Sequence, residues 1–188
     1  MNTVKSNVKH RSVRASDEKE RLFNEANAAW DRGDLRQAFA LFTRSAEMGD
    51  VGSQVDLGYF FDNGLSVKKD KKKALEWYRR AYLQGHVSGA NNIATVYRDL
   101  GDTKKMLWWF RRAAAMGDLD VLLDLGKRYE RGASVHRSLP KAELFYRRVL
   151  GSKHATQDDR AKAKARLANL RERKRKRIWP TRGSGTRL

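Results

Sequence analysis

The feature of this sequence that most constrains its fold is a short motif that recurs at nearly equal spacing. Its copies are Trp77-Tyr78-Arg79-Arg80-Ala81, Trp109-Phe110-Arg111-Arg112-Ala113 and Phe145-Tyr146-Arg147-Arg148-Val149. They begin 32 and 36 residues apart, and a weaker copy, Leu41-Phe42-Thr43-Arg44-Ser45, begins 36 residues before the first. This period is typical of a helical solenoid, in which each repeat is one supersecondary unit. Because a solenoid presents an extended surface, we expect function on that surface rather than in a catalytic pocket.

Each repeat is predicted to be a helix, a turn and a second helix. Within each half, apolar residues recur at steps of three and four, so they line one face of a helix. Glycine can adopt the left-handed conformation that often ends a helix, which explains its regular recurrence. The predicted first helices stop at Gly64, Gly101 and Gly132, and the second helices stop at Gly49, Gly85 and Gly117.

This pattern resembles the Sel1-like repeat family, a branch of the tetratricopeptide-like α-solenoids. The second repeat reads Leu57-Gly58-x-x-Phe61-x-x-Gly64, and the fourth reads Leu125-Gly126-x-x-Tyr129-x-x-Gly132. Thirteen positions separate Phe61 from Ala74, and only nine separate Tyr97 from Met106, so the third repeat looks like an ordinary tetratricopeptide unit. The resemblance covers about residues 21 to 151. It implies a scaffold or adaptor, without identifying a partner.

The expected fold is all-α: a short α-solenoid of about four helix-turn-helix repeats with a C-terminal capping helix. The acidic pair Asp158-Asp159 fits the start of that last helix, where the helix dipole favours negative charge. We predict a flexible basic segment at 1–17, a repeat domain at 18–155, a capping helix at 156–173 and a disordered basic tail at 174–188. The predicted repeats are about 18–50, 51–86, 87–118 and 119–154.

The charge balance points to anionic partners. The formal net charge is +19, from 41 basic and 22 acidic residues. Such a field attracts anions from a distance and speeds their association. The sequence has no cysteine, no apolar run long enough to span a membrane and no secretory signal within residues 1–20. We therefore expect a soluble cytoplasmic protein that is not inserted in a membrane.

Catalysis is not expected. The histidines do not recur at metal-binding spacing with other histidines or with carboxylates. Without cysteine, a thiol nucleophile is excluded, and the sequence has neither a Gly-rich phosphate loop nor a Gly-x-Ser-x-Gly motif. We predict no catalytic residue, no cofactor and no metal site. The histidines are His10, His86, His136 and His154.

The first helices of such solenoids line a concave groove, which is the predicted partner-binding surface. Taking Leu57, Ile93 and Leu125 as core residues, helical spacing turns three residues of each first helix towards the groove. Tyr59 is the preferred contact, because tyrosine is over-represented among residues that dominate binding energy. The predicted groove residues are Val55, Tyr59, Asp62, Asn91, Thr95, Arg98, Leu123, Lys127 and Glu130.

Two further surfaces are candidates for partner binding. Trp108 precedes the core residue Trp109, so it either contacts a partner or packs against a neighbouring helix. Lys71, Lys72 and Lys73 lie in a lysine-rich loop that is either a solvated ridge or a docking site for an acidic partner. In the arginine pairs, the resemblance implies a structural role for the second member, with its stem over aromatics. The first members, which are freer, are Arg79, Arg111 and Arg147.

The basic tail allows three interpretations: a solubilising segment, an organelle address, or an arm that binds nucleic acid or another polyanion. Trp179 beside it could stack on a base. The residues predicted to contact a polyanion are Arg173, Lys174, Arg175, Lys176 and Arg177.

Three functions of different class follow. The favoured one is a non-enzymatic interaction module that holds a protein partner with an acidic surface or segment in its groove. The second is an inhibitor of one specific protein, because small Sel1-like repeat proteins resemble the immunity partners that bacteria encode beside toxins. The third is an adaptor whose basic tail contacts nucleic acid. The sequence does not fix an oligomeric state.

Overall fold

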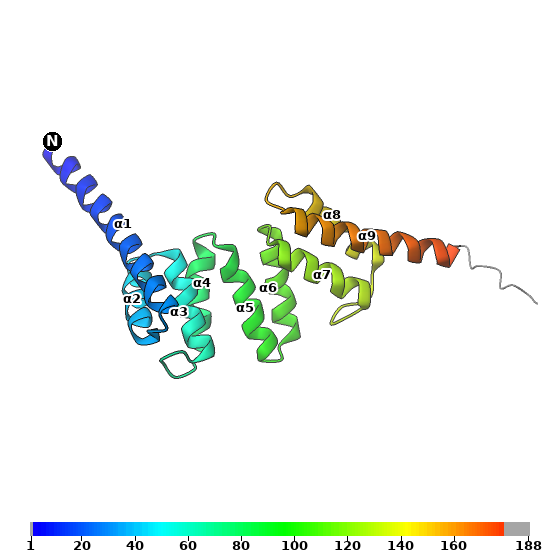
Figure 1. Cartoon of the computed structure of the whole chain (residues 1–188), viewed down its shortest axis with the longest axis horizontal. Helices are drawn as coiled ribbons and strands as arrows, with labels where there is room; N and C mark the ends of the chain where they lie inside the picture. Colours follow the sequence, from blue (N-terminus) through cyan, green and yellow to red (C-terminus); the bar gives the residue numbers. More distant parts are fainter. Residues whose placement is uncertain (1, 179–188) are drawn as a thin grey trace, which may run out of the picture. The chain divides into compact units, whose positions relative to one another are not determined.

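A computed structural model describes residues 2–178, with side chains described for residues 16–175 (Figure 1). Within the described range the chain forms nine helices and no strand, which confirms the predicted all-α fold of helical repeats. The helices are α1 (Asn2–Asp31), α2 (Leu35–Glu47), α3 (Val51–Asn63), α4 (Lys71–Leu83), α5 (Val87–Asp99), α6 (Thr103–Ala115), α7 (Leu119–Arg131), α8 (Leu139–Gly151) and α9 (Gln157–Ile178).

The chain divides into two compact units, Met1–Trp109 and Phe110–Leu188. In the first unit α1, α2, α3 and α4 each pack against the next helix along the chain, and α3 also contacts α5. In the second unit α7 packs against α8, and α8 packs against α9. None of the helices within the described residues is long and apolar enough to cross a membrane.

Both ends of the described range 2–178 are more helical than the sequence predicts. Helix α1 begins at Asn2, inside the segment 1–17 that was expected to be flexible. Helix α9 continues to Ile178, beyond the expected end of the capping helix at residue 173. The basic run 171–177 contains neither glycine nor proline. It can therefore continue the helix although its positive charges repel one another.

The helix starts follow from capping by side chains. Asp50 accepts a hydrogen bond from the backbone N–H of Ser53 at 2.7 Å, and Asp118 accepts one from Val121 at 3.0 Å. Such caps satisfy backbone donors that have no partner within the helix. The start of α4 is capped in the same way by Asp70, which is bonded to the backbone of its own first turn. Aspartates therefore set where α2, α3, α4 and α7 begin, whereas α8 is capped by Ser138 and α5 has no side-chain cap.

The two long loops predicted in the second and fourth repeats fold alike. Each follows a glycine in the left-handed conformation, with φ of 75° at Gly64 and 81° at Gly132. In the second repeat the backbone N–H of Asp70 donates to the carbonyl of Phe61 at 2.8 Å. In the fourth, Ser138 donates to Tyr129 at the same distance. These bonds return each loop to the helix it has just left.

Glycine also permits the closest helix contacts in the core. A Cβ at Gly58 would lie 2.6 Å from Cε1 of the Tyr78 ring, and Gly126 faces the ring of Tyr146 in the same way. Gly89 lies against the backbone of α4, where its Cβ would be 2.7 Å from the carbonyl oxygen of Tyr78. Paired helices can therefore approach more closely than any side chain would allow.

A contact between an arginine, a tyrosine and a lysine, which we call a polar tier, joins the third repeat to the second. The ring of Tyr97 lies under Nζ of Lys105, 5.1 Å from the ring centroid, and its hydroxyl accepts a hydrogen bond from Nη2 of Arg79 at 3.3 Å. The lysine belongs to the same repeat, whereas the arginine comes from the preceding one. Arg79 was predicted to be the freer member of its pair, and this contact shows that it is engaged within the fold.

The fourth repeat carries the same tier. Nη2 of Arg111 donates to the hydroxyl of Tyr129 at 3.2 Å, and Nζ of Lys141 lies 5.4 Å from the ring centroid. The second repeat has Phe61 in place of tyrosine, so only the lysine contact is formed there, through Lys73 at 5.2 Å. The first arginine of each pair is thus a structural residue wherever the next repeat supplies a hydroxyl.

Among the second members of the pairs, Arg80 lies over the ring of Trp77 at 4.2 Å, as the resemblance implied. Arg148 instead donates from Nη2 to the backbone carbonyl of Ala114 at 2.7 Å. Arg147, predicted to be the freer member of its pair, forms an ion pair with Glu143 at 2.8 Å.

Candidate partner-binding surfaces

The open part of the predicted groove lies on the neighbouring helices α3 and α5. Tyr59 and Arg98 are exposed, while Val55, Asn91 and Thr95 are half-buried. Tyr59 is 43% exposed, and its ring stacks on Trp30 of α1 with centroids 5.7 Å apart and planes 29° apart. Trp30 is itself fixed by an edge-to-face contact with Phe60 at 4.9 Å. Tyr59 is therefore both accessible and held in one orientation.

Asp62 does not line an open groove. The residue is buried, at 7% exposure, and Nζ of Lys71 lies 2.5 Å from its Oδ1. The same ammonium group lies 2.8 Å from Oδ2 of Asp99 on α5. The long loop of the second repeat returns the start of α4 to α3, which brings Lys71 onto Asp62. Both residues are thus engaged within the fold, which corrects their assignment to partner-binding surfaces.

Glu130 is buried as well, at 2% exposure. The hydroxyl of Tyr146 donates to its Oε2 at 2.9 Å, and Nη1 of Arg173 on α9 lies 3.2 Å from its Oε1. Burial raises the pKa of the Tyr146 hydroxyl, and the hydrogen bond to Glu130 raises it further. Leu123 on the same helix is buried, and Lys127 is half-buried. The prediction that Leu123 and Glu130 face an open groove is therefore wrong, because they are packed inside the second compact unit.

The remaining loop lysines border a small cavity, which we call the lysine pocket. Its volume is about 430 Å³. The rings of Phe39 and Phe61 lie 5.6 Å apart and give it an apolar wall. Lys72 is exposed on the adjoining first turn of α4. The pocket is lined by Phe39, Phe61, Val67, Lys68, Lys69, Asp70 and Lys73.

Trp108 combines the two alternatives considered for it. Its ring packs edge-to-face on Trp109, with centroids 4.7 Å apart and planes 82° apart. The residue is nevertheless 47% exposed. Contact of Trp108 with a partner therefore stays a prediction.

The basic end of α9 is partly engaged. Arg173 pairs with Glu130, and Nζ of Lys174 lies 2.8 Å from Oε2 of Glu143, whereas Arg175 is exposed. The side chains of Lys176 and Arg177 lie outside the described residues, as does the whole of Trp179.

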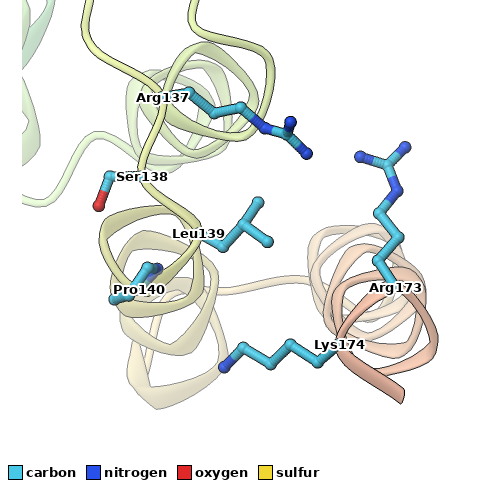
Figure 2. Close-up of a pocket in the computed structure, with 6 residues that line it drawn as sticks. All are labelled: Arg137, Ser138, Leu139, Pro140, Arg173 and Lys174. Carbon is cyan, nitrogen blue, oxygen red and sulfur yellow. The ribbon is translucent and has the colours of Figure 1, made fainter. Parts of the chain in front are cut away.

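Arg173 and Lys174 also border a larger cavity, of about 770 Å³, which we call the arginine pocket (Figure 2). Its other wall is the segment that leads into α8. Arg137, which no motif in the sequence marks, contributes a third cation. The pocket is lined by Arg137, Ser138, Leu139, Pro140, Arg173 and Lys174.

Asp56 on α3 is a further group that the sequence did not reveal. Burial raises its pKa to about 6, and the nearby negative charge of Asp50 contributes to the rise. Because the pKa in the folded chain lies above the ordinary value of 3.8, ionised Asp56 destabilises the fold. This loss of folding stability is absent below about pH 4 and grows as the pH rises towards 6.

Replacing Asp56 with asparagine is therefore expected to stabilise the chain at pH 8 by about 1–2 kcal/mol and to have little effect at pH 4. Urea unfolding followed by circular dichroism at both pH values measures this difference. Asp99 is the comparison, because its hydrogen bond to Lys71 lowers its pKa, so Asp99→Asn should not stabilise at pH 8. An equal gain from Asp56→Asn at both pH values would contradict the prediction.

The comparisons with known proteins agree with the architecture. A family model described as Sel1 repeat matches residues 31–50, 51–86 and 102–118. No curated protein sequence matches the chain.

Among solved structures, a Sel1 repeat protein from Oxalobacter formigenes is 26% identical, with a TM-score of 0.54. The match covers 70% of this chain and 54% of that one, so the chain spans about half of that protein's length. A protective antigen of uropathogenic Escherichia coli with an SLR fold is 26% identical at a TM-score of 0.41, covering 73% and 39%. An immunity protein from Pseudomonas aeruginosa is 15% identical at a TM-score of 0.37, covering 82% and 81%. The last two TM-scores are too low to support a conclusion about function.

Proposed function

We propose that this chain, which belongs to the Sel1-like repeat family, is a non-enzymatic module. It would bind a protein partner across α3 and α5. Repeats of this fold commonly mediate protein–protein interaction. The proposed contact surface comprises Val55, Tyr59, Asn91, Thr95 and Arg98.

The observation that carries this proposal is the state of Tyr59. Its side chain is 43% exposed although it is large and aromatic. Because Trp30 already holds the ring by stacking, binding would cost little side-chain entropy. Rigid, accessible aromatic side chains are the residues that most often dominate the binding energy of an interface.

The partner is proposed to carry an acidic surface or segment. Lys68, Lys69 and Lys73 border the lysine pocket, whose only carboxylate, Asp70, is hydrogen-bonded to the backbone of α4. Carboxylates of a partner could therefore pair with these ammonium groups, while an apolar side chain fills the space against Phe39 and Phe61. Such pairing favours fast association and makes it sensitive to salt.

Replacing Tyr59 with alanine is expected to weaken partner binding by about 30-fold or more, as for a residue that dominates an interface. The partner is first captured from an extract of the source cells and identified by mass spectrometry. The affinity of the purified pair is then measured by calorimetry. Thermal unfolding of the variant shows whether the lost stacking on Trp30 alters the fold.

The matched control is Leu83→Ala, which truncates another large exposed apolar side chain, on α4. Affinity unchanged by Tyr59→Ala would exclude this surface, and a larger loss from Leu83→Ala would place the interface on α4. An inhibitor of one specific toxin or enzyme would use the same kind of surface, and the identity of the captured partner separates inhibitor from adaptor. Contact with nucleic acid through residues 173–177 stays a prediction.

A further inference from the structure

The arginine pocket has more positive charge than its neighbouring carboxylates balance. Glu130 is shared by Arg166 and Arg173, and Glu143 is shared by Arg147 and Lys174. Each of these carboxylates thus faces two cations. Arg137 adds another cation, since its Nε donates to the backbone carbonyl of Glu130 at 3.2 Å and not to a carboxylate. None of the residues that line the pocket is acidic.

The cations converge on the pocket from two sides. Figure 2 shows the guanidinium groups of Arg137 and Arg173 extending towards each other from opposite walls, with Leu139 between their stems. Lys174 reaches across the lower part of the same space. The hydrogen bond from Nε to Glu130 fixes the Arg137 side chain, and the ion pair with Glu130 holds Arg173. The pocket is therefore positioned to receive an anion without large rearrangement.

The geometry favours a phosphoryl group over a carboxylate. A carboxylate presents both oxygens along one edge, which suits a single guanidinium fork. A tetrahedral phosphoryl group presents oxygens in several directions, so it can accept hydrogen bonds from two opposed arginines at once. It also carries more than one negative charge near neutral pH, which matches the excess of cations.

We propose that the arginine pocket binds a small phosphorylated ligand, with Arg137 and Arg173 bonded to one phosphoryl group and Lys174 neutralising its charge. The volume of about 770 Å³ exceeds what one phosphoryl group fills, so the site has room for a second phosphate or an attached group. This site lies in the second compact unit and is independent of the protein-binding surface on α3 and α5.

Calorimetric titration of the full chain with inorganic pyrophosphate, at about 0.15 M salt, tests the proposal. We expect saturable binding at one site, weakened about tenfold or more by Arg137→Gln, because a hydrogen bond to a charged group is lost. Lys174→Gln should also weaken binding. It is the safer variant for the fold, since Glu143 keeps its pair with Arg147. Circular dichroism melts confirm that each variant is folded.

Arg171→Gln is the matched control, because it removes an exposed positive charge outside the pocket lining from α9, the helix that carries Arg173 and Lys174. Its affinity for pyrophosphate should stay within about twofold of the unaltered chain. Equal weakening by Arg171→Gln and Arg137→Gln would overturn the proposal, because it would show general attraction to a basic surface. Absence of saturable binding would overturn it as well.

Two further ligands define the chemistry. Citrate, a carboxylate of similar charge, is expected to bind at least tenfold more weakly than pyrophosphate, and equal affinity would overturn the preference for phosphoryl groups. Adenosine diphosphate separates two sources of the same chemistry. Tighter binding than pyrophosphate supports a ligand with an attached group, and equal binding supports recognition of the phosphates alone.

Discussion

Replacing Gly89 with alanine is expected to lower the free energy of unfolding by about 2–3 kcal/mol. The added Cβ would lie 2.7 Å from both the carbonyl oxygen of Tyr78 and the amide nitrogen of Tyr82. These are backbone atoms of α4, so no side-chain rotation can relieve the contact and the two helices must move apart. Alanine's higher helix propensity offsets up to about 1 kcal/mol of that cost.

Urea unfolding followed by circular dichroism measures the effect. Gly151→Ala is the control: Gly151 is the last residue of α8, and a Cβ there would meet no atom within 4 Å. It should leave stability unchanged or raise it slightly. If Gly89→Ala unfolds at the same urea concentration as the unaltered chain, α4 and α5 do not pack as closely as described.

The second large effect is expected at Glu130, where Glu130→Ala should cost about 2–3 kcal/mol. The substitution leaves a cavity and removes the acceptor of the Tyr146 hydroxyl, which is buried in the same contact. It also leaves Arg166 and Arg173 without their shared carboxylate. Because both arginines are partly exposed, water solvates them after the change and limits the loss.

Glu143→Ala is the matched control, because Glu143 pairs with two cations at the surface. Exposed ion pairs contribute little, so this change should cost less than about 1 kcal/mol. Glu130→Gln should fall between the two, because its amide oxygen can still accept from Tyr146. Thermal and urea unfolding of the three variants give the order, and equal losses at 130 and 143 would show that burial does not distinguish them.

The repeat architecture was predictable because its determinants are local. Glycines at fixed positions, such as Gly64 and Gly132, mark left-handed helix ends. The longer interval from Phe61 to Ala74 correctly indicated a longer loop between α3 and α4. Alternating apolar and small residues then determine which faces of the helices pair. These signals lie within one repeat, so the sequence alone displays them.

The candidate sites were less predictable, because helical spacing gives the direction of a side chain but not what covers it. Asp62 and Glu130 occupy the same position in their repeats and were both placed in an open groove. Lys71, which follows the long loop, covers Asp62. Arg173, which is 43 residues further along the chain, reaches Glu130 from α9. Arg137 likewise gains its significance only from that helix. Contacts between distant segments leave no periodic signal in a sequence.

The polar tiers, each formed by an arginine, a tyrosine and a lysine, also affect how repeats can be added to or removed from such a chain during evolution. Arg79 and Arg111 are 32 residues apart, and so are the tyrosines that accept their hydrogen bonds, Tyr97 and Tyr129. If 32 consecutive residues between Arg79 and Tyr129 were deleted, Arg79 and Tyr129 would be as far apart in the sequence as each now is from its hydrogen-bond partner. Whole repeats could be gained or lost during evolution without breaking the bond that links one to the next.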